Sequence, residues 1–226
     1  MTTLLSAFQE STEVAVKESI SLIDLLMKGG YMVVPLALLL VAAIYIFFER
    51  IFTLKAAAKV PNNFNEQVRQ LIERGDLNGA RNFCAQIKSP LARMVEKGIS
   101  RIGSPLKTIE ASIENVGKVE IYRLEKNLSL LATIAGAAPM IGFLGTVTGM
   151  IQAFIAIAQE EGQVSPKMLS SGIYEAMITT AVGLFIGIVA YLAYNYLVTR
   201  VSKLVHRMEY TSVDFIDLLQ EPQNVR

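Results

Sequence analysis

The sequence predicts an all-α integral membrane protein with three transmembrane helices and long cytoplasmic helical extensions. The composition is the first reason: 52% of the 226 residues are hydrophobic, 18% are charged, and the mean hydropathy is +0.42. Soluble domains carry about 25% charged residues. The second reason is three apolar stretches that reach or exceed the roughly 20 residues a helix needs to cross a bilayer. The third is a basic excess at one end of each stretch, which gives the spans an orientation.

The three spans are expected at residues 29–49, 127–158 and 169–199. The first is bounded by charged residues at both ends. The second and third apolar stretches are longer than a bilayer requires, since each residue adds about 1.5 Å to a helix. We therefore expect both helices to project beyond the membrane rather than to tilt strongly.

Basic residues gather at one end of all three spans: Arg50, Lys55, Lys59, Lys118, Arg123, Lys126, Arg200, Lys203 and Arg207. By the positive-inside rule that end is cytoplasmic. Residues 1–28 and the loop 159–168 are then periplasmic, while residues 50–126 and the C-terminal helix or tail 200–226 are cytoplasmic. The N-terminal segment lacks the basic start and unbroken apolar core of a signal peptide. It reads as an amphipathic helix on the membrane surface or as a solvated tail.

The cytoplasmic segment is expected to be helical throughout. Gly75 is a candidate residue just past a helix end, Asp76 can cap the next helix, and Pro90 can begin a third. Ser104 and Pro105 resemble an N-cap followed by proline at the first helical position. No breaker separates this last helix from the second span, so one continuous helix is expected there.

Several function classes are excluded by composition. The net charge of +1 argues against a nucleic-acid partner. A single cysteine, Cys84, excludes an intrachain disulfide framework and is expected to be a buried core residue. The only histidine, His206, lies beyond the last span, so an intramembrane Ser-His protease or a metal enzyme is not expected. We expect no enzyme activity, metal or cofactor.

Glu175 is the only charged residue between Met168 and Thr199. Insertion scales put the cost of an acidic residue at mid-membrane at about 2.5–3.5 kcal/mol, and such residues usually face a bundle interior or a water path. No span contains a basic residue to pair with it. Glu175 is therefore protonated, hydrated or partnered by another chain, unless it lies at the outer headgroups.

Small residues form a stripe on each of the last two spans, with a Gly-x-x-x-Gly step in both. Such stripes let helix backbones approach closely in lipid, and simple packing within or between subunits explains them. Pro139 interrupts the hydrogen-bond ladder of the second helix and predicts a kink. The helix-packing candidates are Gly142, Gly145, Gly149, Gly183, Gly187 and Pro139.

Two threonines are expected at one depth. Thr146 follows Lys126 by 20 residues, and Thr180 precedes Arg200 by 20 residues. In antiparallel helices with matched cytoplasmic ends, both lie about 30 Å above the basic flanks. Glu175 lies about 7 Å further outward.

Thr148 and Thr179 complete this polar set. Thr148 lies between the two levels, and Thr179 is one turn from Glu175 on nearly the same face. The alternative for each threonine is structural, because a buried hydroxyl can bond the backbone carbonyl one turn back.

The motifs resemble the ExbB/TolQ/MotA family of proton-channel motor subunits, and within it the ExbB branch most. In the second span they are Leu131–Ile134, Ala138-Pro139, Gly142–Val147 and Gly149-Met150; in the third they are Gly172–Ala176, Thr180–Leu184 and Tyr194-Asn195. The first span, from Gly30 through Pro35 to Glu49-Arg50, also fits. The resemblance covers all three spans and their spacing.

The resemblance implies a homopentameric ring in the bacterial inner membrane, around an ExbD-like single-span partner that brings a membrane aspartate. Proton flow would drive relative rotation and energise a TonB-like protein for transport across the outer membrane. Thr146, Glu175 and Thr180 would line the proton path, with Arg200 at the cytoplasmic mouth. Thr148 and Thr179 depart from the family pattern and would add polarity. The alternatives are a TolQ-like motor, a gliding or flagellar stator, or a passive scaffold or channel in contact with lipid.

Overall fold

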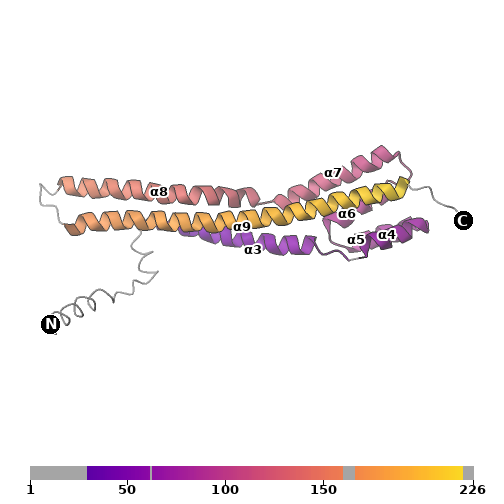
Figure 1. The fold of residues 1–226 in the computed structure, drawn as a ribbon, viewed down its shortest axis with the longest axis horizontal. Coiled ribbons are helices and arrows are strands. Elements are labelled where there is room, and N and C mark those ends of the chain that lie inside the picture. Colours follow the sequence, from indigo (N-terminus) through magenta and orange to yellow (C-terminus); the bar gives the residue numbers. More distant parts are fainter. Residues whose placement is uncertain (1–29, 62, 160–165, 221–226) are drawn as a thin grey trace, which may run out of the picture. The chain divides into compact units, whose positions relative to one another are not determined.

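The computed structural model describes residues 30–61, 63–159 and 166–220, and every regular element there is an α-helix. The helices are α3 (Val33–Ala57), α4 (Phe64–Glu73), α5 (Leu77–Gln86), α6 (Pro90–Ile99), α7 (Leu106–Glu125), α8 (Leu128–Gln159) and α9 (Pro166–Gln220) (Figure 1). The all-α expectation is confirmed. The expected amphipathic segment 1–28 and most of the loop 159–168 lie outside the described residues.

The described residues contain three helical stretches that are long and apolar enough to cross a membrane, as expected. They are Val33–Ala57, Leu106–Gln159 and Gly172–Gln220. The first helix starts four residues later than the expected span and continues beyond it to Ala57. The third span is part of α9, whose 55 residues continue without interruption into the C-terminal region. A helix of that length projects well beyond a bilayer, which needs about 20 residues.

The chain divides into two compact units. The first contains the described residues 30–37, 138–159 and 166–185. The second contains residues 38–61, 63–137 and 186–220. Each unit is described below by itself.

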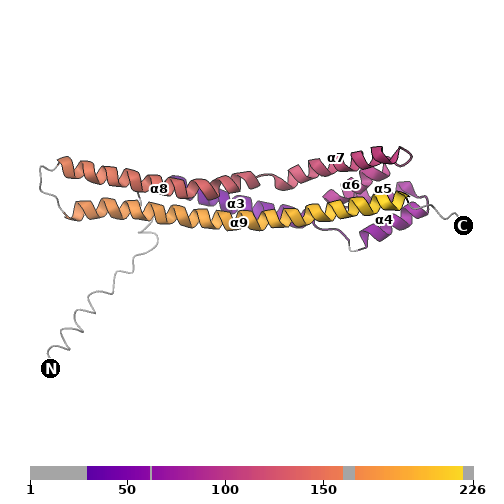
Figure 2. The same cartoon turned by 45° about the horizontal axis from the view of Figure 1, so that its top comes forward.

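In the first unit, α8 and α9 run antiparallel and side by side (Figures 1 and 2). Gly142 lies against Gly183. About two turns further along α8, Gly149 lies against Ala176. The order of these contacts, rising along α8 and falling along α9, establishes the antiparallel arrangement. Small side chains at the contact let the two backbones approach closely.

In the second unit, helices α4–α7 pack with the C-terminal part of α9 (Figure 2). A Cβ added to Gly98 of α6 would meet the side chains of Phe215 and Ile113, so three helices converge at that point. Ile113 and Phe215 are almost fully buried. The core is apolar at helical spacing, which is why these short helices form despite their modest length.

The turn between α4 and α5 forms as the sequence predicts. Gly75 has φ +76°, a left-handed conformation that glycine adopts without strain. Its N–H donates to the Ile72 carbonyl, and the Asp76 N–H donates to the Leu71 carbonyl, which together make a Schellman motif. The Asp76 carboxylate then accepts from the Gly79 N–H at 2.8 Å and caps α5.

The start of α6 also forms as predicted, with Pro90 in the first turn. Ser89, the N-cap residue, is fully buried, and its hydroxyl donates to the Ala57 carbonyl at 2.9 Å. Helix α7 begins one residue later than expected, because Pro105 itself is its N-cap.

The expected continuous helix from Pro105 into the second span is wrong. The chain leaves the helical conformation at Lys126, where ψ is 136°, and Asn127 has φ +65°. Asparagine tolerates this left-handed region better than other residues with a side chain, because its short polar group bonds locally. Helices α7 and α8 are therefore separate segments.

Cys84 is a buried core residue, as expected, with 1% of its surface exposed. Burial, with a smaller contribution from Glu96, raises the pKa of the thiol from 9.0 to about 12. The reactive thiolate is scarce in the folded protein at pH 8, and we expect alkylation by iodoacetamide to be roughly 1000-fold slower than in the unfolded chain. Mass spectrometry with and without denaturant measures the ratio. Equal rates would show that the thiol is accessible.

Candidate functional site

Thr146 and Thr180 form a polar pair across the α8–α9 contact of the first unit. Their Oγ1 atoms are 3.3 Å apart, which confirms that the two residues share one level. The Thr180 hydroxyl donates to the Gly142 carbonyl at 2.9 Å, and the Thr146 hydroxyl donates to the Phe143 carbonyl at 2.6 Å. Both side chains are half-buried. With each hydrogen directed at a carbonyl, the two oxygens present lone pairs that can accept a hydrogen bond.

Thr179 lies between the two helices. It is 2% exposed, and its hydroxyl donates to the Ala176 carbonyl at 2.8 Å. A Cβ added to Gly145 would lie 2.4 Å from this hydroxyl, so Thr179 fills the space that the glycine leaves. The Thr179 hydroxyl, which we expected to line the proton path, therefore has its hydrogen-bond partner inside the protomer.

Thr148 bonds its own helix. Its hydroxyl donates to the carbonyls of Leu144 and Gly145 at 3.0 and 3.1 Å. This is the structural alternative that we considered for each threonine, in which the hydroxyl returns to the backbone one turn back. The side chain remains half-buried.

The Glu175 carboxylate lies against Gly30, at the turn before α3. A Cβ added to Gly30 would lie 1.6 Å from Glu175 Oε1, so the carboxylate occupies the volume of a side chain at that position. Gly30 has φ +64°, and its carbonyl accepts from the Val33 N–H at 3.3 Å, at the start of α3. Nothing in the helical periodicity of the sequence predicts this contact between Gly30 and Glu175. The one signal in the sequence is the Gly29-Gly30 pair directly before the first span, since paired glycines mark a turn.

The glycine candidates form the contact between α8 and α9. A Cβ on Gly183 would lie 2.6 Å from the Ala138 carbonyl oxygen and 2.8 Å from the Gly142 Cα. A Cβ on Gly149 would lie 3.0 Å from the Ala176 Cβ. The packing that these stripes favour therefore occurs between two helices of one protomer. In the second unit, Gly187 is buried.

Pro139 lies inside α8, which continues through it as one helix. Proline has no N–H, so the carbonyl one turn earlier loses its usual partner. The expected kink stays a prediction.

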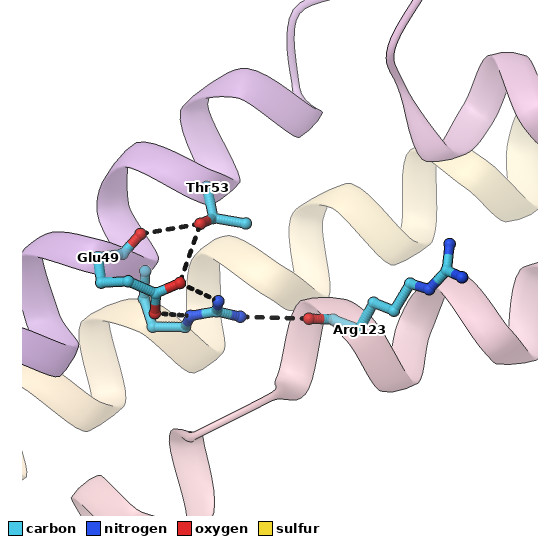
Figure 3. A network of polar contacts seen from close by, with 4 residues as sticks. Glu49, Thr53 and Arg123 are labelled. Atoms are coloured by element: carbon cyan, nitrogen blue, oxygen red, sulfur yellow. Dashed lines mark hydrogen bonds and ion pairs between the residues drawn. The ribbon is translucent and has the colours of Figure 1, made fainter.

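A second polar cluster supports the end of α7 (Figure 3). Arg50 is only 4% exposed, and its guanidinium pairs with Glu49 and donates to the Arg123 carbonyl at 3.2 Å. The Thr53 hydroxyl donates to the Glu49 backbone carbonyl at 2.9 Å. Because the last carbonyls of a helix lack intrahelical donors, Arg50 caps α7 just before the break at Asn127.

Arg200, the candidate at the cytoplasmic mouth, is exposed on α9. Its Nη2 and Nε donate to the Tyr196 hydroxyl oxygen at 2.8 and 3.1 Å, and its guanidinium carbon is 5.1 Å from the centre of the Tyr196 ring. A cation above a tyrosine face is stabilised by the ring quadrupole. This side chain is therefore held in position without a carboxylate.

Residues 86–210 match the model of the MotA/TolQ/ExbB proton channel family. The chain belongs to this family. The match includes the threonine pair and Glu175, whereas Gly30 lies outside it. Together with the three apolar helices, membership makes the chain a multi-pass inner-membrane protein of the MotA/TolQ/ExbB family.

Individual relatives in the MotA/TolQ/ExbB family carry two names. The chain is 32% identical over 214 residues to the Tol-Pal system protein TolQ of Haemophilus influenzae, covering 88% of this chain and 91% of that protein. It is 29% identical to TolQ of Pseudomonas aeruginosa, covering 84% and 88%. It is 45% identical to the biopolymer transport protein ExbB of Neisseria gonorrhoeae, but only over 75 residues, or 33% and 34% of the two chains.

Proposed function

We propose that this chain is an ExbB-like subunit of a motor driven by the proton motive force. With an ExbD-like single-span partner, it would energise a TonB-like protein for transport across the outer membrane. The observation that carries the proposal is the pair formed by Thr146 and Thr180, two hydroxyls 3.3 Å apart inside apolar spans. Membership of a proton channel family supports it.

The threonine pair suits a carboxyl group that changes its protonation state. A protonated carboxyl on the partner can donate to the lone pairs of Thr146 and Thr180, whose hydrogens point to backbone carbonyls. A deprotonated carboxylate on the partner can instead accept a hydrogen bond from Thr146 or Thr180, if that hydroxyl turns away from its backbone carbonyl. Each protonation change therefore alters which hydrogen bonds form, and with them the preferred position of the partner helix.

The free energy released by one proton crossing the membrane is of the same order as the cost of a charged carboxylate at mid-membrane. One proton that crosses the membrane releases about 2.3 kcal/mol per 100 mV. A bare acidic residue at mid-membrane costs about 2.5–3.5 kcal/mol on insertion scales. A single proton per step is therefore enough to shift the partner between two subunits, provided that hydroxyls lower the cost of the charged form.

In the proposed assembly, five copies surround the partner, with the N-terminus in the periplasm and the C-terminus in the cytoplasm. Thr146, Thr180 and Glu175 face the path, and Glu175 hydrates or electrostatically tunes its outer end rather than carrying every proton. Arg200 lies near the cytoplasmic mouth. Thr179 joins the packing residues in this proposal, because it is buried between α8 and α9.

A TolQ-like role in envelope maintenance is the second candidate. It is supported by the TolQ relatives, which match 84–88% of the chain; relatives named as an ExbB homologue and as ExbB-like also match 84% of it, so coverage alone does not separate the two roles. Co-purification with the chains encoded next to this one separates the two roles. A TonB-like partner supports the ExbB-like role, and a peptidoglycan-binding partner supports the TolQ-like role. Mass measurement of the same complex tests the pentamer.

We expect Thr180→Val, in the assembled complex, to lower proton flux by tenfold or more. Valine keeps the shape of threonine but cannot bond a carboxyl group, and a hydrogen bond to a charged group contributes about 1.5–3 kcal/mol. A pH-sensitive dye trapped in proteoliposomes measures the flux. Thr199→Val is the matched control, since Thr199 is an exposed residue of α9 that bonds the Asn195 carbonyl. Normal flux in Thr146→Val/Thr180→Val would refute the proposal.

A further inference from the structure

A basic groove lies between α3 and α9 in the second unit. Its volume is about 290 Å³. The lining includes the buried side chains of Leu54, Leu197 and Leu204 and four cationic side chains, which are Lys55, Arg200, Lys203 and Arg207. We propose that this basic groove binds the phosphate headgroup of an anionic phospholipid from the cytoplasmic leaflet. The choice of leaflet rests on the proposed orientation of the chain.

Among the residues that the structure describes, no carboxylate balances the charge of the basic groove, because no acidic side chain lines it. Within the described residues, none of its four cations forms an ion pair with a carboxylate, whereas Arg50, Arg93 and Arg123 of the same unit all do. Three of the cations come from one face of α9 at spacings of three and four residues, and Lys55 joins them from the last turn of α3. Like charges brought together repel, so an anion between them is stabilising.

An apolar groove continues from the basic groove along the same two helices. It has a volume of about 320 Å³ and shares Tyr196 with the basic groove. Apart from Tyr196, its lining is wholly aliphatic or aromatic hydrocarbon: Ala43, Ile44, Phe47, Val189, Ala190, Leu192 and Ala193. Arg200 follows Ala190 by ten residues, or about 15 Å of helix, which is comparable to an acyl chain in one leaflet of a roughly 30 Å hydrocarbon core.

The two grooves together select an amphiphile. A free phosphate ion would use the basic groove and leave the apolar groove empty. An acidic peptide would not extend into a membrane-spanning part of α3 and α9, where its backbone groups would lack partners. A phospholipid matches both parts, because its phosphate meets the cations while an acyl chain follows the apolar groove. Basic pockets between transmembrane helices on the cytoplasmic side are known to hold anionic headgroups.

The test is native mass spectrometry of the purified complex, titrated with dioleoyl-phosphatidylglycerol or dioleoyl-phosphatidylcholine. We expect the anionic lipid to bind at least tenfold more tightly. Lys203→Gln/Arg207→Gln should weaken binding of the anionic lipid roughly 30-fold and so abolish the preference, since each basic residue near an anionic surface contributes about fivefold. Lys55→Gln/Lys203→Gln is a second variant with the same expected result. Circular dichroism checks that each variant is folded.

Lys88→Gln/Lys107→Gln is the matched control, because both lysines are exposed in the second unit but lie outside the basic groove. It should retain the full preference. Inorganic phosphate at millimolar concentration should not displace the bound lipid. The proposal is wrong if the two lipids bind equally, if the control loses as much preference as the variants, or if phosphate competes fully. Loss of a co-purifying protein with unchanged lipid preference would instead identify a protein-docking surface.

Discussion

Gly183→Ala is expected to disrupt the α8–α9 contact and prevent assembly of a stable complex. The added Cβ would lie 2.6 Å from the Ala138 carbonyl oxygen and 2.8 Å from the Gly142 Cα. These are backbone atoms, which cannot rotate away as the end of a side chain can. Overpacking typically costs about 1–3 kcal/mol, and in lipid the close approach itself holds the helices together. Thermal denaturation of the purified complex, followed by gel filtration, measures the loss.

Gly136→Ala provides the control for Gly183→Ala. Gly136 lies in α8, and a Cβ there would have no atom within 4 Å beyond its chain neighbours and the adjacent backbone of its own helix. Alanine also favours a helix over glycine by about 1 kcal/mol in water. We therefore expect this variant to be neutral or slightly stabilising. Equal loss in both variants would mean that any added methyl group disturbs α8 and α9, and that the contact at Gly183 has no special importance.

Gly30→Ala is expected to reduce proton flux to the level of Glu175→Ala. The methyl group would fall on Glu175 Oε1, so the carboxylate must leave its present position. Our proposal assigns this carboxylate to the outer end of the proton path, and its displacement should therefore affect flux more than folding. Flux in proteoliposomes and the yield of assembled complex are measured on the same preparations.

The strain of a left-handed residue must be separated from the displacement of Glu175. Gly75→Ala serves this purpose, because Gly75 has φ +76° and open space around its Cα. Both substitutions place an alanine in the left-handed conformation, which costs about 1–2 kcal/mol. Only Gly30→Ala also displaces the Glu175 carboxylate. In a Glu175→Ala background, Gly30→Ala should have no further effect on flux. An additional loss there would show that Gly30 acts independently of Glu175.

Glu175→Gln distinguishes charge from shape. Glutamine fills the space beside Gly30 but carries no charge. If Glu175 tunes the path electrostatically, both Glu175→Gln and Glu175→Ala lower flux. If it only holds the start of α3 in place, Glu175→Gln retains flux and Glu175→Ala does not. Full function in both would contradict any role of Glu175 in the path.

The class of the protein and the shared level of Thr146 and Thr180 could both be predicted from the sequence. Long apolar stretches can only be helices in lipid, because every backbone group must find a partner inside its own segment. Counting 1.5 Å per residue then placed Thr146 and Thr180 at one level, which their 3.3 Å separation confirms. The turn at Gly75 and Asp76 could also be predicted, because its hydrogen bonds join residues only a few positions apart in the sequence.

The neighbour that each polar side chain meets depends on how the helices pack, and it could not be predicted from the sequence. Thr179 and Thr180 are adjacent in the sequence, yet one is buried against Gly145, whereas the other donates to the Gly142 carbonyl and places its Oγ1 3.3 Å from that of Thr146. A difference of about 100° around the helix axis separates them, and the path of the facing helix sets the outcome. Likewise, the Arg50 guanidinium that bonds the Arg123 carbonyl at the end of α7 and the Glu175 carboxylate that lies against Gly30 both join segments far apart in the chain. Helical periodicity gives the face of a residue but not the identity of its partner.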